Sequence, residues 1–300
     1  MNPALQCPGV ALTASELIGL RAVALNARSE PVLAALPGGF ATRRKGHGQE
    51  VADIREYVDG DDIRHLDRGT TARTGQLHVR QFQEERDRVT LLVADFRPAM
   101  HWGLGRAFRS VAAAEVLSFV GWRLVEEGAR VGLLAVVPGD PVVVPARGRT
   151  RGMLRVIGGL VRAHQQSLEH AASRTGADAS LVGALRRADR LCPPGSEILI
   201  ASGFDGEGQD LTDQLNALDR RRHTRLIMVS DADPARLPAG GYPVRTSDGR
   251  RLRLMLGQGT APTPSHEETV AGRRALRIDA AEPVAKTVQR VAGAFAGGIL

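Results

Sequence analysis

Residues 89–100 read VTLLVADFRPAM, and this stretch decides the fold class. Its first six residues, 89–94, form a short and nearly continuous apolar run, which is typical of a strand covered on both faces of a sheet. Asp95 follows the run directly. Ligands of open α/β sheets bind just beyond the carboxyl ends of the strands, so Asp95 is the first candidate site residue.

Three further short apolar runs follow, and stretches of helical periodicity separate them. The runs are residues 131–137, 198–201 and 226–229, and the helical stretches are residues 106–127, 153–164, 181–191 and 211–221. Alternation of this kind predicts an α/β fold with a doubly wound, mostly parallel, Rossmann-like sheet.

Additional elements are expected on both sides of this pattern. Residues 13–28 are predicted to form a helix, because Thr13 and Glu16 have the spacing of a capping box. Asp248 and Gly249 form a turn dipeptide between residues 242–247 and 251–256, which predicts a C-terminal β-hairpin. We expect a closing helix over residues 282–295, and two parts overall: an N-terminal segment, residues 1–88, and an α/β domain, residues 89–300.

Composition limits the cellular location and the kinds of partner that we expect. Hydrophobic residues make up 43% of the 300 residues, enough for a sizeable core. The net charge of +7 permits an anionic partner, but no stretch interleaves aromatic and basic residues as a single-strand groove does, so we expect no nucleic acid. Cys7 and Cys192 form no CxxC pair, which favours a cytoplasmic location. No apolar segment approaches the roughly 20 residues of a membrane span, although attachment through a membrane-bound partner stays open.

A second stretch carries a family resemblance. Residues 55–73 read REYVDGDDIRHLDRGTTAR and resemble the signature REYxxGDDxRxIDWxxTAR of the family called domain of unknown function 58. One position departs from it, because Arg68 stands where the family has Trp. The matching positions are Arg55, Glu56, Tyr57, Gly60, Asp61, Asp62, Arg64, Asp67, Thr71, Ala72 and Arg73.

The resemblance implies properties that composition and periodicity do not. Members of this family are described as MoxR-associated, with a von Willebrand factor A-like domain. The resemblance therefore implies that fold, a MoxR-type AAA+ ATPase as partner, and a chaperone-like role in assembling or activating other proteins. It implies no established catalytic activity.

Von Willebrand A-like domains often bind Mg²⁺ through an Asp-x-Ser-x-Ser motif, and this chain departs from it. Asp95 is present, but Arg97 and Ala99 stand at the two serine positions. Mg²⁺ requires six oxygens, whereas alanine offers none and arginine only donates. Gly203 stands where a second aspartate is expected. We therefore expect a degenerate site with no metal or other cofactor.

Several alternatives remain open at this stage. Arg97 either takes the place of the ion and pairs with Asp95, or points into solvent while Asp95 caps the next helix. Asp205 or Thr150 could still complete a magnesium site.

The signature stretch is also the best candidate for a protein interface, because Arg and Tyr are favoured at interfaces. The alternative is that this run only joins the N-terminal segment to the sheet. The candidate interface residues are Arg55, Glu56, Tyr57, Asp61, Asp62, Arg64, Asp67 and Arg73.

Three functions are consistent with these patterns. The first is a non-enzymatic protein-interaction module that works with a MoxR-type ATPase and without a divalent cation. The second is Mg²⁺-dependent, adhesion-type protein binding through Asp95. The third is a hydrolase that uses Asp95, which has little support because the sequence offers no paired acid and base.

Overall fold

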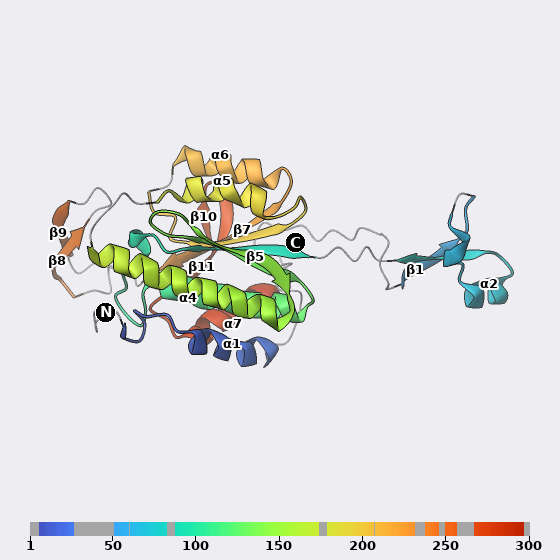
Figure 1. Ribbon diagram of the computed structural model, residues 1–300, viewed down its shortest axis with the longest axis horizontal. Coiled ribbons are helices and arrows are strands. Elements are labelled where there is room, and N and C mark those ends of the chain that lie inside the picture. The colour runs from blue at the N-terminus through green and yellow to red at the C-terminus, as the bar shows by residue number, and fades with distance from the viewer. Residues whose placement is uncertain are drawn as a thin grey trace. The chain divides into compact units, whose positions relative to one another are not determined.

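A computed structural model describes residues 6–26, 51–59, 61–82, 88–173, 179–206, 208–231, 238–245, 250–256 and 267–296. The chain forms two compact units. The larger comprises Met1–Gly39 together with Arg88–Leu300, and the smaller comprises Phe40–Asp87. Figure 1 shows both units and labels many of their elements.

The larger unit is built on a seven-stranded sheet of order β10-β11-β7-β6-β3-β4-β5. Strands β3, β4, β6, β7 and β11 run parallel, while β5 and β10 are antiparallel strands at the two edges. The connection after β3 leads to β4 on one side, and the connection after β6 leads to β7 on the other, so the order reverses between β3 and β6. Open α/β sheets bind ligands at such a switch point. The bounds are β3 Val89–Asp95, β4 Arg130–Val136, β5 Val142–Gly148, β6 Glu197–Ser202, β7 His223–Ser230, β10 Glu267–Val270 and β11 Arg273–Asp279.

Helices cover both faces of this sheet (Figure 1). One face packs against α1 (Ala14–Asn26), α3 (Arg109–Glu126), α4 (Arg149–Ser173) and α7 (Val284–Ala296). The other packs against α5 (Leu181–Leu191) and α6 (Gln209–Asp219). Each face therefore has its own apolar cluster, and the strands between them are buried on both sides as their continuous apolar runs predict.

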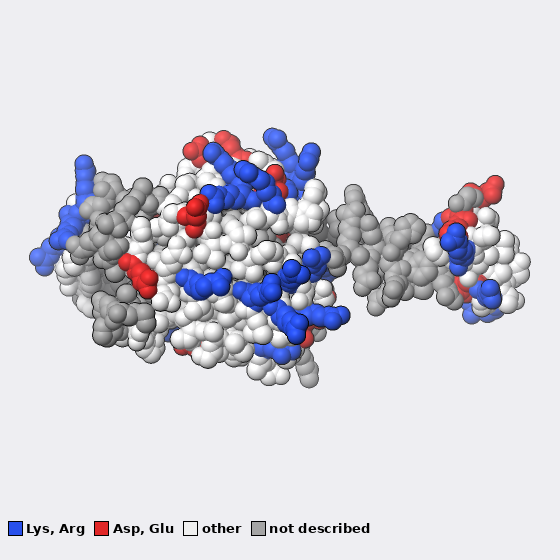
Figure 2. All heavy atoms as spheres, viewed as in Figure 1, with Lys and Arg blue, Asp and Glu red and all other residues white. Residues whose placement is uncertain are grey.

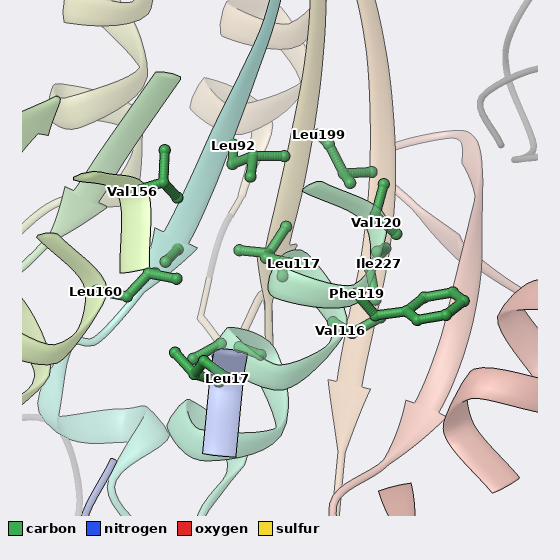
Figure 3. Close-up of a cluster of buried hydrophobic side chains, with 14 of the residues drawn as sticks. Leu17, Leu92, Val116, Leu117, Phe119, Val120, Val156, Leu160, Leu199 and Ile227 are labelled. Atoms are coloured by element: carbon green, nitrogen blue, oxygen red, sulfur yellow. The ribbon is translucent and has the colours of Figure 1, made fainter. Parts of the chain in front are cut away.

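The first of these clusters is centred on α3 (Figure 3). Leu117 and Val120 of this helix are fully buried and lie towards Leu92 of β3 and Leu199 of β6. From the outer side, Leu17 of α1 packs into the same cluster, and the indole of Trp122 donates a hydrogen bond of 3.0 Å to the Leu17 carbonyl. Helix α1 is therefore part of the sheet unit, and the expected N-terminal segment, residues 1–88, divides between the two units.

Helix α4 approaches the edge of the sheet closely because glycine lies on its buried side. A Cβ atom at Gly159 would lie 2.7 Å from Val144 Cγ2 and 2.8 Å from Leu133 Cδ2. The adjacent Gly158 has no atom within 4 Å of the same position. Packing therefore requires glycine at position 159 but not at position 158.

The predicted strands and helices are confirmed, with differences at their ends and at the sheet edges. Helix α4 begins at Arg149 and ends at Ser173, well beyond the predicted 153–164, because polar residues on its outer face conceal the apolar period there. Strands β5, β10 and β11 were not predicted. Each of them carries charged or exposed residues in the pattern of an edge or half-covered strand, with β5 alternating between exposed and buried positions.

The predicted C-terminal hairpin is present as a separate two-stranded sheet. β8 (Gly240–Arg245) pairs antiparallel with β9 (Arg251–Leu256), and Arg245 lies opposite Arg251. The Asp248-Gly249 dipeptide that predicted the turn lies outside the described residues.

The smaller unit contains the signature, residues 55–73. No helix or strand was predicted from the sequence in this part of the chain. β1 (Val51–Glu56) and β2 (His78–Phe82) pair antiparallel. Between them lie a 3-10 turn, η3 (Ile63–His65), and a short helix, α2 (Arg68–Thr74).

No helix among the described residues has both the length and the apolar character needed to cross a membrane.

The two neighbouring glycines of α4 make a matched pair for testing this packing. Gly158→Ala should raise the free energy of unfolding by about 0.5–1 kcal/mol, because alanine is the better helix former and its methyl group meets nothing. Gly159→Ala should lower it by about 1 kcal/mol or more, since overpacking outweighs the same helix gain. Urea denaturation measures both values, and a stabilised Gly159→Ala variant would contradict the close approach of α4 to the sheet.

Candidate functional site

The carboxyl end of β3 carries a buried carboxylate that is paired with an arginine. Asp95 is 1% exposed, and Arg97 lies two residues further along, before the 3-10 turn η4 (Pro98–Met100). Arg97 donates from Nε to Asp95 Oδ1 at 3.0 Å and from Nη2 to Oδ2 at 2.8 Å. Its backbone N–H also donates to Asp95 Oδ1 at 3.0 Å. The guanidinium therefore lies against Asp95 rather than in solvent, and the carboxylate also holds the backbone of the loop that leads into η4, which has no side-chain cap.

Ser202, at the end of the neighbouring strand β6, closes the other side of Asp95. Its hydroxyl donates to Asp95 Oδ2 at 2.6 Å and accepts from the backbone N–H of Phe204 at 3.0 Å. The first bond joins the ends of β3 and β6 directly, and the second holds the loop that follows β6. Phe204 has a φ of 53°, a left-handed conformation that non-glycine residues seldom adopt, so this loop is held in a specific shape.

A second arginine reaches the same edge from α3 and explains Gly203. Arg109 is 4% exposed, donates from Nε to the Val229 carbonyl at 2.8 Å, and forms an ion pair of 2.7 Å with Asp205. A Cβ atom at Gly203 would lie only 1.5 Å from Arg109 Nη2. The aspartate expected at position 203 is therefore incompatible with this arginine.

Thr150 was also considered as a metal ligand, but it lies at the amino ends of the parallel strands, whereas Asp95 lies at their carboxyl ends. β5 is antiparallel to β4, and its last residue, Gly148, pairs with Arg130 at the start of β4. Asp95 pairs instead with Val136 at the end of β4. The suggestion that Thr150 could assist Asp95 was wrong, because the chain returns to the amino edge before α4 begins.

The residues at this edge do not fit Mg²⁺. The oxygens of Asp95 already accept hydrogen bonds from Arg97 and Ser202, Ala99 supplies no oxygen, and Asp205 is paired with Arg109. A hard cation needs several oxygens converging on one point. Within the described parts of the chain, no three His, Cys, Asp or Glu residues gather in a way that could hold a metal ion.

Next to this edge lies a buried network of histidines and serines that links η4, α3 and α4. His101 Nδ1 shares a hydrogen bond of 3.2 Å with Ser110, and Ser110 shares one of 3.0 Å with His164 Nε2. His101 Nε2 is 2.7 Å from the hydroxyl of Ser167, which in turn donates to the Phe96 carbonyl. The network ties the loop after β3 to the middle of α4.

Burial keeps both histidines of this network neutral. Desolvation lowers the pKa of His101 to about 4, although the charge of Asp95 opposes the shift. Desolvation lowers the pKa of His164 to about 3, and His101 lowers it further. Both ring nitrogens of His101 and Nε2 of His164 are hydrogen-bonded to serine hydroxyls inside the fold, which indicates a structural role.

In the smaller unit, the three aspartates Asp61, Asp62 and Asp67 of the signature have partners within that unit. Arg55 and Asp61 form a bidentate pair with bonds of 2.7 and 2.6 Å. This pairing lowers the pKa of Asp61, with a smaller contribution from the Val58 backbone N–H, and raises the pKa of Arg55. Asp62 accepts from the Arg64 backbone at the start of η3, and Asp67 accepts from Thr70 at the start of α2. These acids therefore hold the local fold, as N-caps and ion pairs do.

The other signature residues are distributed around the same small unit. Tyr57 is half-buried and its backbone N–H donates to the Leu77 carbonyl, while Glu56 and Arg73 are exposed. Arg64 is exposed and lies 3.6 Å from Asp62. Arg68, which stands in place of the signature tryptophan, is exposed at the first residue of α2. Gly60 lies outside the described residues.

Sequence reasoning found Asp95, Arg97 and Gly203 but missed their partners. Arg109 and Ser202 come from elements distant from Asp95 in the chain, as do Ser110 and His164 of the neighbouring network, and spacing gives no indication that they meet. One available signal was Arg109 next to the apolar run 111–114 at the start of α3, because a buried charge has to find a partner.

Comparison with known proteins gives relatives of unknown function. A family model described as "Protein of unknown function DUF58" matches residues 53–255, more than half of the chain. An uncharacterized protein of Mycobacterium bovis and uncharacterized proteins of two strains of Mycobacterium tuberculosis are each 33% identical over 202 residues. The match covers 65% of this chain and 59% of each relative, so it spans less than two thirds of their length.

The histidine network predicts a loss of stability in acid. The unfolded histidines titrate near 6.5, so between pH 6.5 and 4 the unfolded state binds more protons and stability falls as the pH is lowered. Each histidine adds up to about 1.4 kcal/mol per pH unit to this slope. In His164→Asn the slope measured by urea denaturation between pH 6 and 4.5 should be smaller by about 1 kcal/mol per unit. An unchanged slope would contradict a neutral, buried His164.

The Arg109 guanidinium occupies the space where a side chain at position 203 would lie. The effects on stability of substitutions at these two positions should therefore depend on each other. Gly203→Ala should cost about 1–3 kcal/mol of stability, because the methyl group displaces the guanidinium. In an Arg109→Ala background the same substitution should cost much less, since the space is then open. Urea denaturation of the four proteins of this cycle measures the coupling, and equal costs in both backgrounds would contradict the arrangement.

Proposed function

Because the chain belongs to the DUF58 family of proteins of unknown function, we propose that it is a non-enzymatic protein-interaction module built on a von Willebrand factor A-like sheet. Its partner in this proposal is a MoxR-type AAA+ ATPase, with which it takes part in the chaperone-like assembly or activation of other proteins in the cytoplasm. The order of the parallel sheet and the aspartate at the end of its central strand support the scaffold. The resemblance of residues 55–73 to the family signature supports the partner.

The observation that carries the metal-free part of this proposal is the Asp95–Arg97 pair. A guanidinium held at 2.8 Å by a buried carboxylate supplies the positive charge that a divalent cation would supply. Arginine stays protonated at every physiological pH and is covalently attached, so this charge does not depend on the concentration of any ion. The module therefore binds its partner without a metal.

The arrangement of groups at this edge also supports a non-enzymatic role. A nucleophile needs a neighbouring base that can accept its proton. The Ser202 hydroxyl donates a hydrogen bond to the carboxylate of Asp95, but this carboxylate is buried and paired with Arg97, which makes it a poor proton acceptor. A substrate would have to displace this pair before it could reach either oxygen.

Co-purification tests the proposal directly. We expect the tagged chain to retain a MoxR-type ATPase encoded in the same genome, and to retain it equally in EDTA and in Mg²⁺-containing buffer without nucleotide. Retention that disappears on chelation would instead favour adhesion-type binding through a metal at Asp95. No retention in either buffer would contradict the proposed partner.

Calorimetry on the isolated protein tests the role of Arg97 separately. The wild-type chain should give no stoichiometric Mn²⁺ isotherm, because Asp95 is already paired. The double variant Arg97→Ser, Ala99→Ser restores both hydroxyls and should gain weak binding. A stoichiometric isotherm for the wild type would contradict the substitution of the ion by Arg97.

A further inference from the structure

Strand β5 and helix α4 include a stretch that has five arginines and no acidic residue. Residues 141–168 contain no Asp or Glu, and they span β5 and most of α4. The arginines in this stretch are Arg147, Arg149, Arg151, Arg155 and Arg162, and all five are exposed. A charge of one sign over this length marks a surface with a strong positive potential.

Three of these arginines form one line along the helix, which we call the α4 stripe: Arg151, Arg155 and Arg162. Positions four and eleven residues apart fall within about 40° of each other around an α-helix and span about 16 Å along its axis. Arg147 and Arg149 continue the positive charge towards the start of the helix. In Figure 2, basic side chains gather along the surface over α4.

None of the five arginines has an ion-pair or hydrogen-bond partner among the described residues. Several less exposed arginines of the same unit do have partners, as Arg106 has in Glu115 and Arg222 has in Asp189. The helix N-terminus repels cations, and like charges four residues apart destabilise a helix, so Arg149, Arg151 and Arg155 oppose the stability of α4. No acidic side chain in the part of the chain that the structure describes pairs with these arginines, which points to a compensating charge on another molecule.

The surroundings of the stripe favour a protein as that molecule. Leu154 is 42% exposed beside Arg155, and Gly158, between Arg155 and Arg162, has open space where a side chain would project. An apolar contact and room for close approach, set among arginines, are typical of protein interfaces. A membrane-surface helix needs a continuous apolar face, but the apolar face of α4 is buried against the sheet. A single-strand nucleic acid site needs aromatic side chains, which residues 141–168 lack.

We propose that the α4 stripe is the docking surface for an acidic, amphipathic segment of a partner protein, with carboxylates facing Arg151, Arg155 and Arg162 and an apolar side chain on Leu154. This inference rests on the proposed function, in which the chain acts by binding another protein. It adds the surface and the chemistry of the segment that is recognised. Arginine and carboxylate groups pair in two-pronged hydrogen bonds, which gives the contact direction as well as strength.

Charge reversal on the stripe, with a matched reversal elsewhere, tests this assignment. The probe is a fluorescent helical peptide with glutamates at spacings of four and eleven and leucines between them. The triple variant R151E/R155E/R162E should lose about tenfold or more in affinity by anisotropy, and binding by the wild type should weaken with salt. The control R186E/R190E/R220E changes the net charge equally on exposed arginines of α5 and the end of α6, and should stay within about twofold of the wild type.

Three outcomes would overturn the inference. They are no binding of the peptide to the wild type, an equal loss in the control variant, and tighter binding to a 20-base-pair DNA duplex or to phosphatidylglycerol vesicles than to the peptide. Circular dichroism of each variant establishes that it is folded. If the wild-type chain and the stripe variant both retain the MoxR-type ATPase while the peptide fails, the α4 assignment falls and the proposed function stands. If the peptide result holds but no ATPase is retained, the proposed partner falls instead.

Discussion

A carboxylate buried at the end of the central strand is the constraint around which the rest of this sheet edge is arranged. Asp95 is out of contact with water, and a buried charge is costly unless it is paired and hydrogen-bonded. Arg97 supplies the pair from the same loop, and Ser202 supplies a further hydrogen bond from the next strand. Because β3 lies at the switch point of the sheet, these bonds also join its two halves.

A second arginine, Arg109, is buried and pairs with a second aspartate, Asp205, at the same carboxyl end of the sheet. Arg109 crosses the position of Gly203 to reach Asp205 and the end of β7, so the position where a second metal-binding aspartate is expected has become the path of a guanidinium. Two arginines paired with two aspartates leave little net charge at this edge. In contrast, the arginines at the start of α4 are exposed and unpaired among the described residues. The surface with charge available for a partner is thus the α4 stripe rather than the edge where the fold places its ligands.

The signature of the smaller unit has a structural explanation in its own contacts. The aspartates of the GDD and ID positions pair with Arg55 or cap η3 and α2, and each of these bonds fixes a short element that could not stand alone. A small unit with few buried apolar residues depends on such local hydrogen bonds. Three of the candidate interface residues, Asp61, Asp62 and Asp67, therefore hold the unit folded. Three others, Glu56, Arg64 and Arg73, are exposed.

The sequence by itself determined the α/β class, the central strands and the residue types around Asp95, because apolar runs and helical periods are local properties of the chain. It also indicated that Arg97, Ala99 and Gly203 cannot build a magnesium shell. Only the tertiary structure decided that Arg97 turns onto Asp95, that Arg109 fills the space at Gly203, and that Thr150 lies at the far edge. The first of these follows from the burial of Asp95, which makes a pairing charge necessary, and the other two depend on strand order and on the antiparallel direction of β5. Strand order and direction are set by long-range packing, and the spacing of residues along the chain does not encode them.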